Sequence, residues 1–205
     1  MAPTTKQREF IDIARSEFVE FGYGGASIRS IAKRAEMSLS ALYYHYASKQ
    51  ELLVAILDDG LETFLMMCRT ELDCSDSSAQ SKLRAMVTAF VKFRTLHQEQ
   101  SQLVQTEVRS LEPANLESYE ARQHEPLHTL QKIIDDGVRD GSFHTENPTD
   151  ARRAIAAMCN AIAHWYRPDG GTTVDELVQR YTDLALVIVE AMPTPDISDI
   201  RKSVE

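Results

Sequence analysis

The feature that most constrains this chain is an almost continuous helical spacing of apolar residues, broken only where glycine and proline gather. Residues 6–21 show the pattern, because apolar side chains recur there at steps of three and four and fall on one stripe. The members of this stripe are Phe10, Ile11, Ala14, Phe18 and Phe21. No long alternating run of β-branched residues predicts a strand. We therefore expect an all-α protein.

Breaks and capping residues divide the pattern into segments. Gly22 and the pair Gly24-Gly25 end the first helix, and Ser27 caps a second one. Ser38 can cap a third, which runs to about Tyr44. Ser48-Lys49-Gln50-Glu51 has the form of a capping box and opens a long helix over 48–72. Further helices are expected at 79–97, 99–111, 114–140 with a break or kink near Pro126, 149–166 and 173–191, followed by a flexible tail at 193–205.

The charge of the chain is unevenly distributed. The net charge is −9, which by itself argues against a nucleic-acid ligand. Residues 1–50 nevertheless carry a net charge of +2, and the rest of the chain carries −11. Between residues 27 and 49 the only acidic residue is Glu36, against four basic ones. A small basic head on an acidic body is typical of a local DNA footprint.

The two short helices in this head have the pattern of a helix-turn-helix motif, in which the second helix lies in the major groove. Small side chains at Ser38, Ser40 and Ala41 would let this helix approach base edges. Hydroxyl, imidazole and ammonium groups that suit phosphate oxygens follow it. These groups belong to Tyr43, Tyr44, His45 and Lys49. Two packed surface helices with a solvated basic face are the alternative interpretation.

Residues 27–53, together with Phe18 and Phe21-Gly22-Tyr23 before them, closely resemble the signature of the tetracycline-repressor family. The resemblance implies a helix-turn-helix DNA-binding domain at 1–47 and a ligand-binding and dimerisation domain at 48–205, with 48–72 as the connecting helix. It implies that Ser27 and Arg29 contact phosphates. Ser38, Leu39, Ser40 and Tyr44 would then face the groove, and Tyr43, His45 and Lys49 would clamp phosphates, Lys49 at a helix N-terminus.

The chain departs from the family pattern at two positions, Glu36 and Ser40, where family members usually or often have glycine. A left-handed backbone at Glu36 would cost on the order of 1 kcal/mol. The operator sequence is therefore not transferable from relatives.

The C-terminal half carries a second, shorter resemblance. Trp165-Tyr166-Arg167-Pro168, followed by Gly170-Gly171, ends an alanine-rich helix, and helix termination alone explains these residues. The segment also resembles a branch of the family that includes repressors of lipid and steroid catabolism responding to acyl-coenzyme A thioesters. Ala156-Ala157-Met158-Cys159-Asn160 lacks the bulkier residues expected of a close steroid-type relative. The ligand class therefore stays open.

Polar residues that interrupt apolar faces mark a candidate effector pocket, although a solvated or core role is the alternative for each. The candidate ligand-binding residues are Phe90, Arg94, Glu107, Tyr119, Arg122 and Asn160. The resemblance also places a homodimer interface on helices 149–166 and 173–191. An intramolecular core made by these helices is the alternative.

Other classes of protein find little support in the sequence. His124-Glu125-Pro126-Leu127-His128 matches a zinc-protease pattern, but Pro126 disfavours the unbroken helix that this chemistry needs, and no third ligand follows. The three cysteines match no zinc spacing; idle thiols are the first interpretation and a redox switch between Cys68 and Cys74 the second. No nucleophile–base pair or phosphate loop indicates an enzyme, and no cofactor or metal is expected. No membrane span or secretion signal is evident, which favours the cytoplasm.

The sequence thus predicts a homodimeric, helix-turn-helix repressor that binds double-stranded operator DNA. The expected effector is a small molecule, either an acyl-coenzyme A or another lipid-derived metabolite. A sensor of hydrophobic drugs or aromatic metabolites is the alternative within the same class.

Overall fold

The computed structural model describes the backbone of residues 5–192 and the side chains from Glu9 onward. The flexible tail expected at 193–205 lies outside these residues. The described part contains helices and no strands, so the all-α prediction is confirmed. The helices are α1 (Thr5–Gly25), α2 (Ile28–Arg34), α3 (Leu39–His45), α4 (Lys49–Asp73), α5 (Ala79–Leu96), α6 (Gln98–Glu107), the 3-10 turn η1 (Val108–Ser110), α7 (Pro113–Asp140), α8 (Pro148–Trp165) and α9 (Val174–Ile188).

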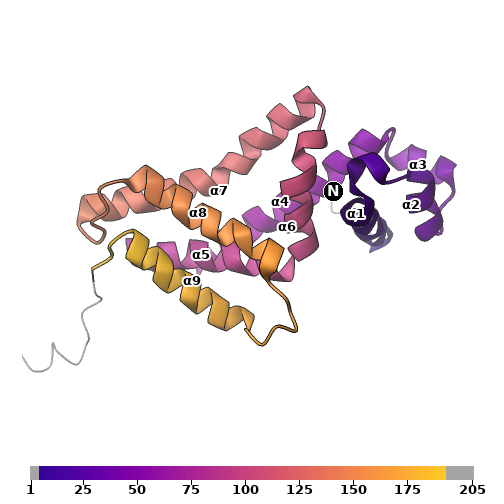
Figure 1. Ribbon diagram of the computed structural model, residues 1–205. Helices are drawn as coiled ribbons and strands as arrows, with labels where there is room; N and C mark the ends of the chain where they lie inside the picture. The colour runs from indigo at the N-terminus through magenta and orange to yellow at the C-terminus, as the bar shows by residue number, and fades with distance from the viewer. Residues whose placement is uncertain (1–4, 193–205) are drawn as a thin grey trace, which may run out of the picture.

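The molecule has a small head and a larger body joined by α4 (Figure 1). Helices α1 to α3 form the head, and α4 runs from the head into the body. Helix α5 lies at the centre of the body and packs against α4, α7, α8 and α9. Helix α6 also packs on α1, so the body contacts the head through more than the connecting helix.

Caps set the starts of several helices, as the sequence predicts. Ser38 Oγ accepts a hydrogen bond from the amide of Ala41 at 3.1 Å, and Ser48 Oγ accepts one from Glu51 at the same distance. The predicted capping box at α4 differs in one bond, because the Glu51 carboxylate accepts from the amide of Ala47 instead of Ser48. Ser27 is the N-cap residue of α2, but its hydroxyl makes no capping hydrogen bond.

Two hydrophobic cores stabilise the fold. The first begins in the head with Phe10, Phe18 and Leu42 and continues along α4 to α6 and α7, where it includes Leu103 and Tyr119. The second fills the body around α5. Since α4 contributes to both cores, a change in its position must disturb the packing of the head and of the body together.

Two sequence expectations for helix interiors differ from the structure. Phe21 was expected on the buried stripe of α1, but 51% of it is exposed, and Gly22 directly after it leaves the helical conformation (φ 67°, ψ 167°). Of the break or kink expected near Pro126, the break is absent, since α7 runs through this residue without interruption. Pro126 is buried, so packing against the body offsets the backbone hydrogen bond that proline cannot make.

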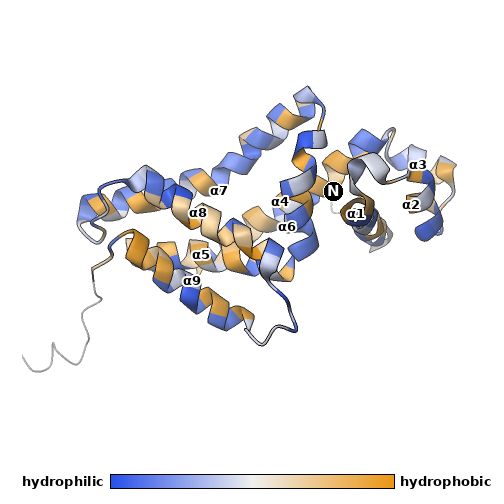
Figure 2. Ribbon diagram, in the orientation of Figure 1, coloured by the Kyte–Doolittle hydropathy of each residue, from blue (hydrophilic) through white to orange (hydrophobic). Residues whose placement is uncertain are grey.

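No helix among residues 5–192 is long and apolar enough to cross a membrane. Apolar residues instead gather on the faces that the helices of the body turn toward one another, while α7 presents a largely hydrophilic surface (Figure 2).

Candidate nucleic-acid interface and effector pocket

Helix α3 has one exposed face and one buried residue that packs into the core of the head. Leu42 is fully buried and anchors the helix in the core of the head. Tyr44 is 86% exposed and Tyr43 51% exposed, although large aromatic side chains usually bury most of their surface. Leu39 is 37% exposed, and Ser38, Ser40 and His45 are exposed as well. The structure thus brings six of the nine predicted DNA-binding residues together on α3 and its N-cap.

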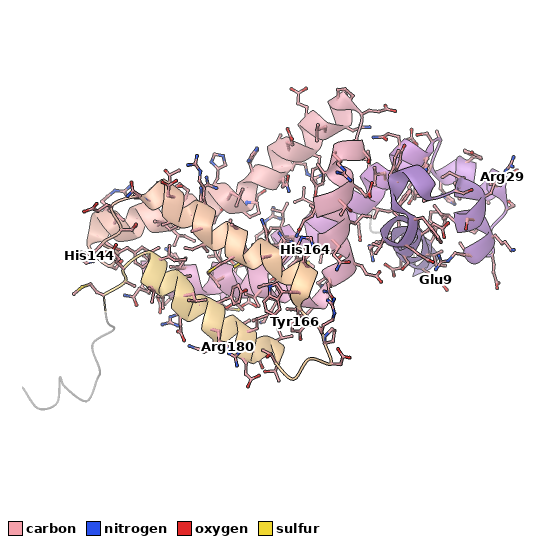
Figure 3. All side chains as sticks on the ribbon, in the orientation of Figure 1. Glu9, Arg29, His144, His164, Tyr166 and Arg180 are labelled. Atoms are coloured by element: carbon pink, nitrogen blue, oxygen red, sulfur yellow. The ribbon has the colours of Figure 1, made fainter. Side chains whose placement is uncertain are left out.

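The remaining exposed candidates lie at the start of α2. Ser27 and Arg29 are both exposed, and Arg29 projects from the outer end of the head, away from the body (Figure 3). Among the described residues Arg29 forms no ion pair, so its charge is available to an outside partner. Arg34 is also a basic residue of the head, but its charge is paired within the protein. Its Nη1 lies 2.8 Å from Glu17 Oε2 and 3.1 Å from Glu20 Oε2.

Glu17 holds α1 and α2 in place. Its side chain is buried, and burial by itself would raise the pKa of the carboxyl group. Hydrogen bonds from Ser30, Arg34 and the backbone of Ser27 outweigh burial and lower the pKa below its ordinary value. The carboxylate is therefore ionised at neutral pH and fixes the orientation of α2 relative to α1.

The turn between α2 and α3 contains a left-handed residue. Glu36 has φ 51°, its amide donates to Lys33, and the amide of Met37 donates to Ala32 at 2.9 Å. This pair of bonds is a Schellman motif, whose left-handed position is normally occupied by glycine. The strain predicted at Glu36 is therefore present in the structure.

Lys49 lies at a joint between the head and the body. Its ammonium group is 4.6 Å from the centre of the Tyr23 ring, and burial lowers its pKa while Glu107 opposes that effect. The neighbouring Gln50 is buried, and with its amide correctly oriented it donates to Tyr23 Oη and to Ser110 O and accepts from the amide of Glu112. Lys49 thus contacts Tyr23 of the head, while its neighbour Gln50 contacts the segment that connects α6 to α7.

Two of the six candidate effector residues line one pocket. Arg94 and Asn160 lie in the wall of an open pocket of about 430 Å³ between α5, α6, α7 and α8. Arg94 Nε and Nη2 donate to Asn160 Oδ1 at 3.1 and 2.7 Å. Nothing in the sequence singles out the other lining residues, because apolar and polar side chains at these positions are ordinary on a helix. They are Val104, Gln105, Val108, Arg109, Leu116, Glu120 and Gln123.

The other four candidates lie elsewhere. Phe90 is buried in the core of the body against Phe64. Arg122 pairs with Asp58 and Glu62 of α4. Glu107 is buried beside the head–body joint and accepts a hydrogen bond from Ser110.

Tyr119 is the fourth of these candidates, and burial raises the pKa of its hydroxyl. Its side chain belongs to the core that joins the head to the body.

The zinc-like motif lies on one face of α7. Because α7 is unbroken, His124 and His128 are one turn apart, with ring centres at 6.3 Å, so Pro126 does not keep the two imidazole rings off a shared face. The two rings line a shallow pocket together with Arg152, whose positive charge disfavours a cation there. Residues 5–192 contain no group of three or more side chains able to hold a metal ion.

Cys68 and Cys74 differ in their exposure to solvent. Cys68 is buried, and burial raises the pKa of its thiol to about 12, whereas Cys74 is exposed at the end of α4. A thiol with such a pKa is protonated at neutral pH and reacts slowly.

Helices α8 and α9 leave apolar side chains uncovered. Leu184 and Val187 of α9 are 51% and 73% exposed, and Trp165 at the end of α8 is 47% exposed and stacks with Tyr181. Exposed apolar side chains on two neighbouring helices are typical of an interface with another chain.

A helix-turn-helix head with an exposed second helix, joined to a helical body that holds a pocket, defines a ligand-responsive DNA-binding regulator. Comparison with known families agrees with this class. Residues 10–56 match the family model of bacterial regulatory proteins of the tetR family, and residues 76–189 match the tetracyclin repressor-like C-terminal domain. The chain belongs to the TetR family.

Similar proteins cover almost the whole chain. The HTH-type transcriptional repressor KstR2 of Rhodococcus jostii is 27% identical over 88% of this chain and 89% of its own length. A crystal structure of a tetR-family regulatory protein from Rhodococcus RHA1 has a TM-score of 0.85 and 26% identity, and covers 93% of this chain and 100% of its own. The structure of AibR with isovaleryl coenzyme A and operator DNA has a TM-score of 0.81, at 20% identity over 91% of this chain and 100% of its own.

Proposed function

We propose that this protein is a homodimeric, cytoplasmic transcriptional repressor that binds operator DNA through α3 and leaves it when a small molecule binds the body. The observation that carries the proposal is the exposed face of α3, which stands on a buried Leu42 anchor in a head of positive charge. The repressor name of the KstR2 relative supports it. We place the boundary between the DNA-binding head and the ligand-binding and dimerisation body at residues 47 and 48.

In the proposed complex, each residue of the head has a role set by its position. Ser38, Leu39, Ser40 and Tyr44 face the major groove, where short side chains allow close approach to base edges. Phosphate contacts come from Ser27, Arg29, Tyr43, His45 and Lys49. The two heads of the dimer would sit in successive major grooves, about 34 Å apart.

The effector acts on this spacing through the joint between head and body. Val108 and Arg109 of η1 line the pocket, and Ser110 and Glu112, which follow in the chain, contact Gln50 at the start of α4. A ligand that displaces η1 would therefore shift Gln50 and the adjoining end of the head. Release requires that the ligand prefer the shifted form, and a thousandfold preference corresponds to roughly 4 kcal/mol.

We propose an acyl-coenzyme A thioester or another lipid-derived metabolite as the effector. The Trp165-Tyr166 end of α8 and the isovaleryl coenzyme A bound by the structurally similar AibR support this class. A sensor of hydrophobic drugs or aromatic metabolites is the second candidate, favoured by the apolar wall of the pocket at Val104, Val108 and Leu116.

A salt titration of DNA binding tests the core of the proposal. Affinity for the promoter region of the protein's own gene should fall steeply as salt rises, and Arg29→Ala should reduce the slope by about 1 because one phosphate contact is lost. Lys132→Ala, which removes an exposed cation from the body, serves as the matched control and should leave the slope unchanged. Weak binding with no dependence on salt would contradict a DNA-binding function.

Variants of the reading helix separate phosphate contacts from base contacts. Tyr43→Ala should weaken binding to all sequences alike, whereas changes at Ser40 should alter which sequence is preferred. The effector is tested by titrating acyl-coenzyme A esters into the protein–DNA complex, with Gln50→Leu as a variant whose response should be weaker. If no ester changes the DNA affinity of the wild type, the thioester version is wrong.

A further inference from the structure

Arg94 is a buried cation without a carboxylate partner. Only 9% of the residue is exposed, and its guanidinium carbon lies 5.1 Å from the ring centres of both Phe64 and Phe93. Within residues 5–192 its side-chain hydrogen bonds go to the neutral amide oxygen of Asn160, and no aspartate or glutamate pairs with it. Arg15, whose side chain is also largely buried, has an acidic partner in Asp59.

The groups around Arg94 do not compensate its charge. Burial lowers the pKa of Arg94 to about 10, so the guanidinium still carries its proton at neutral pH. The groups that act on it electrostatically are the thiols of Cys159 and Cys68 and the hydroxyl of Tyr119. Burial raises the pKa of both thiols to about 12, and these groups are therefore neutral. Burying an uncompensated charge lowers the stability of the folded protein, so stability does not explain why an arginine occupies position 94.

The pocket beside Arg94 offers that explanation. Arg94 and Asn160 form one part of its wall, and Val104, Val108 and Leu116 form an apolar part. Its volume of about 430 Å³ is in the range of small-molecule sites. The rest of the lining is polar and more exposed than Arg94: Gln105, Arg109, Glu120 and Gln123. A buried polar pair beside an apolar part suits a ligand that has a hydrocarbon body and a polar end.

We infer that the pocket binds an amphiphilic carboxylic acid, whose carboxylate pairs with Arg94 and whose hydrocarbon part packs against Val104, Val108 and Leu116. The inference rests on the proposed function and narrows its effector to the second class named there, a lipid-derived metabolite, here one with a free carboxylate. Asn160, whose amide oxygen accepts from Arg94, keeps its amide N–H groups for the same carboxylate.

A carboxylate fits this position better than a phosphate or a thioester. One guanidinium compensates one negative charge, whereas a phosphate monoester carries about −1.5 to −2 at neutral pH. A thioester carbonyl is uncharged and leaves the arginine uncompensated. The planar guanidinium also matches the two oxygens of a carboxylate.

The binding test uses calorimetry without DNA, on the full chain. Straight-chain acids from hexanoate to dodecanoate are compared with the primary amides, the alkyl phosphates and the coenzyme A thioesters of equal chain length. At least one acid should bind about tenfold or more tightly than its amide, because a charge-assisted hydrogen bond is replaced by a neutral one. Equal affinity of every acid and its amide, or tighter binding of the phosphates or thioesters, would overturn the carboxylate assignment.

Variants locate the site. Arg94→Met should abolish the preference for acid over amide, and Arg94→Lys should retain part of it. Arg109→Met removes the exposed arginine of the same pocket and should reduce the acid affinity by less than about threefold, because solvent screens its charge. A preference that survives in Arg94→Met, or disappears in Arg109→Met alone, would place the anion elsewhere.

A stability measurement also tests the inference if the hydrocarbon part of the natural ligand is not a straight chain. If Arg94 is retained for an anion, Arg94→Met should melt at the same temperature as the ligand-free wild type or higher, since an uncompensated buried charge is removed. A lower melting temperature of Arg94→Met, with no acid bound by the wild type, would show a structural role and overturn the inference.

DNA binding, measured separately, distinguishes the two proposals. An acid that binds at Arg94 without weakening DNA binding would support the site and contradict the effector-release part of the proposed function.

Discussion

At the scale of single residues, two glutamates adopt a left-handed backbone at the ends of helices. Glu36 has a left-handed backbone at the end of α2, and Glu190 has the same φ of 51° and the same pair of hydrogen bonds at the end of α9. A glutamate at such a position carries both the steric cost of its Cβ and a negative charge beside the negative end of the helix.

Glu36→Gly should therefore stabilise the head. Glycine adopts φ 51° without the clash of a Cβ atom, so the free energy of unfolding should rise by about 1 kcal/mol, equivalent to about 2–4 °C in melting temperature. Urea unfolding followed by circular dichroism measures the change. Glu36→Ala is the control, because it removes the charge and keeps the Cβ. An equal gain in both variants would assign the cost to charge and not to backbone strain.

At the scale of elements, tight contacts between helices and loops set which substitutions the fold tolerates. Gly137, inside α7, accepts a hydrogen bond from the amide of Phe143 at 2.9 Å, and the Phe143 ring covers it. Phe143 is 1% exposed, so the ring has no free space into which to move. This contact turns the chain back from α7 toward α8, which carries Asn160 into the wall of the pocket.

Gly137→Ala should destabilise the protein although alanine favours helices. A Cβ on Gly137 would lie 2.2 Å from Cδ2 of Phe143, and such overpacking costs about 1–3 kcal/mol, more than the gain of about 1 kcal/mol in helix propensity. Gly60→Ala in α4 is the matched control, since its Cβ would meet Gln100 at an ordinary 3.6 Å and should be neutral or stabilising. Thermal unfolding compares the two. A melting temperature of Gly137→Ala at or above that of the wild type would disprove the constraint.

Much of the secondary structure could be predicted from the sequence. Helix ends depend on residues within about one turn, so Ser38 and Ser48 marked two of them correctly. The continuity of α7 through Pro126 was not predictable in this way, because the compensating contacts come from other helices.

At the scale of the whole molecule, two protomers must act together for the proposed function. The exposed side chains of Leu184 and Val187 on α9 are the apolar surface that a second copy would cover. A dimer also converts binding of the second head to DNA into an intramolecular step, which raises the affinity for a two-part operator.

Leu184→Glu combined with Val187→Glu should therefore give a monomer. Two carboxylates buried in the interface would cost several kcal/mol each, and sedimentation at micromolar concentration should show loss of the dimer. Operator affinity should fall at the same time. Met66→Glu, at a 60% exposed position of α4, is the control and should leave the dimer intact. A double variant that remains dimeric would move the interface away from α9.

Local structure could be predicted from the sequence alone: the helices, most of their caps, and the helix-turn-helix with Tyr43 and Tyr44 on α3 and Ser38 as its N-cap. These features follow from short-range periodicity and capping, which neighbouring residues decide. Tertiary packing was needed to show that Arg34 pairs with Glu17. It was also needed to show that Arg94 is buried in the wall of a pocket and has no acidic partner. The surroundings of a charge depend on which distant helices pack against it, and spacing along one helix cannot report that.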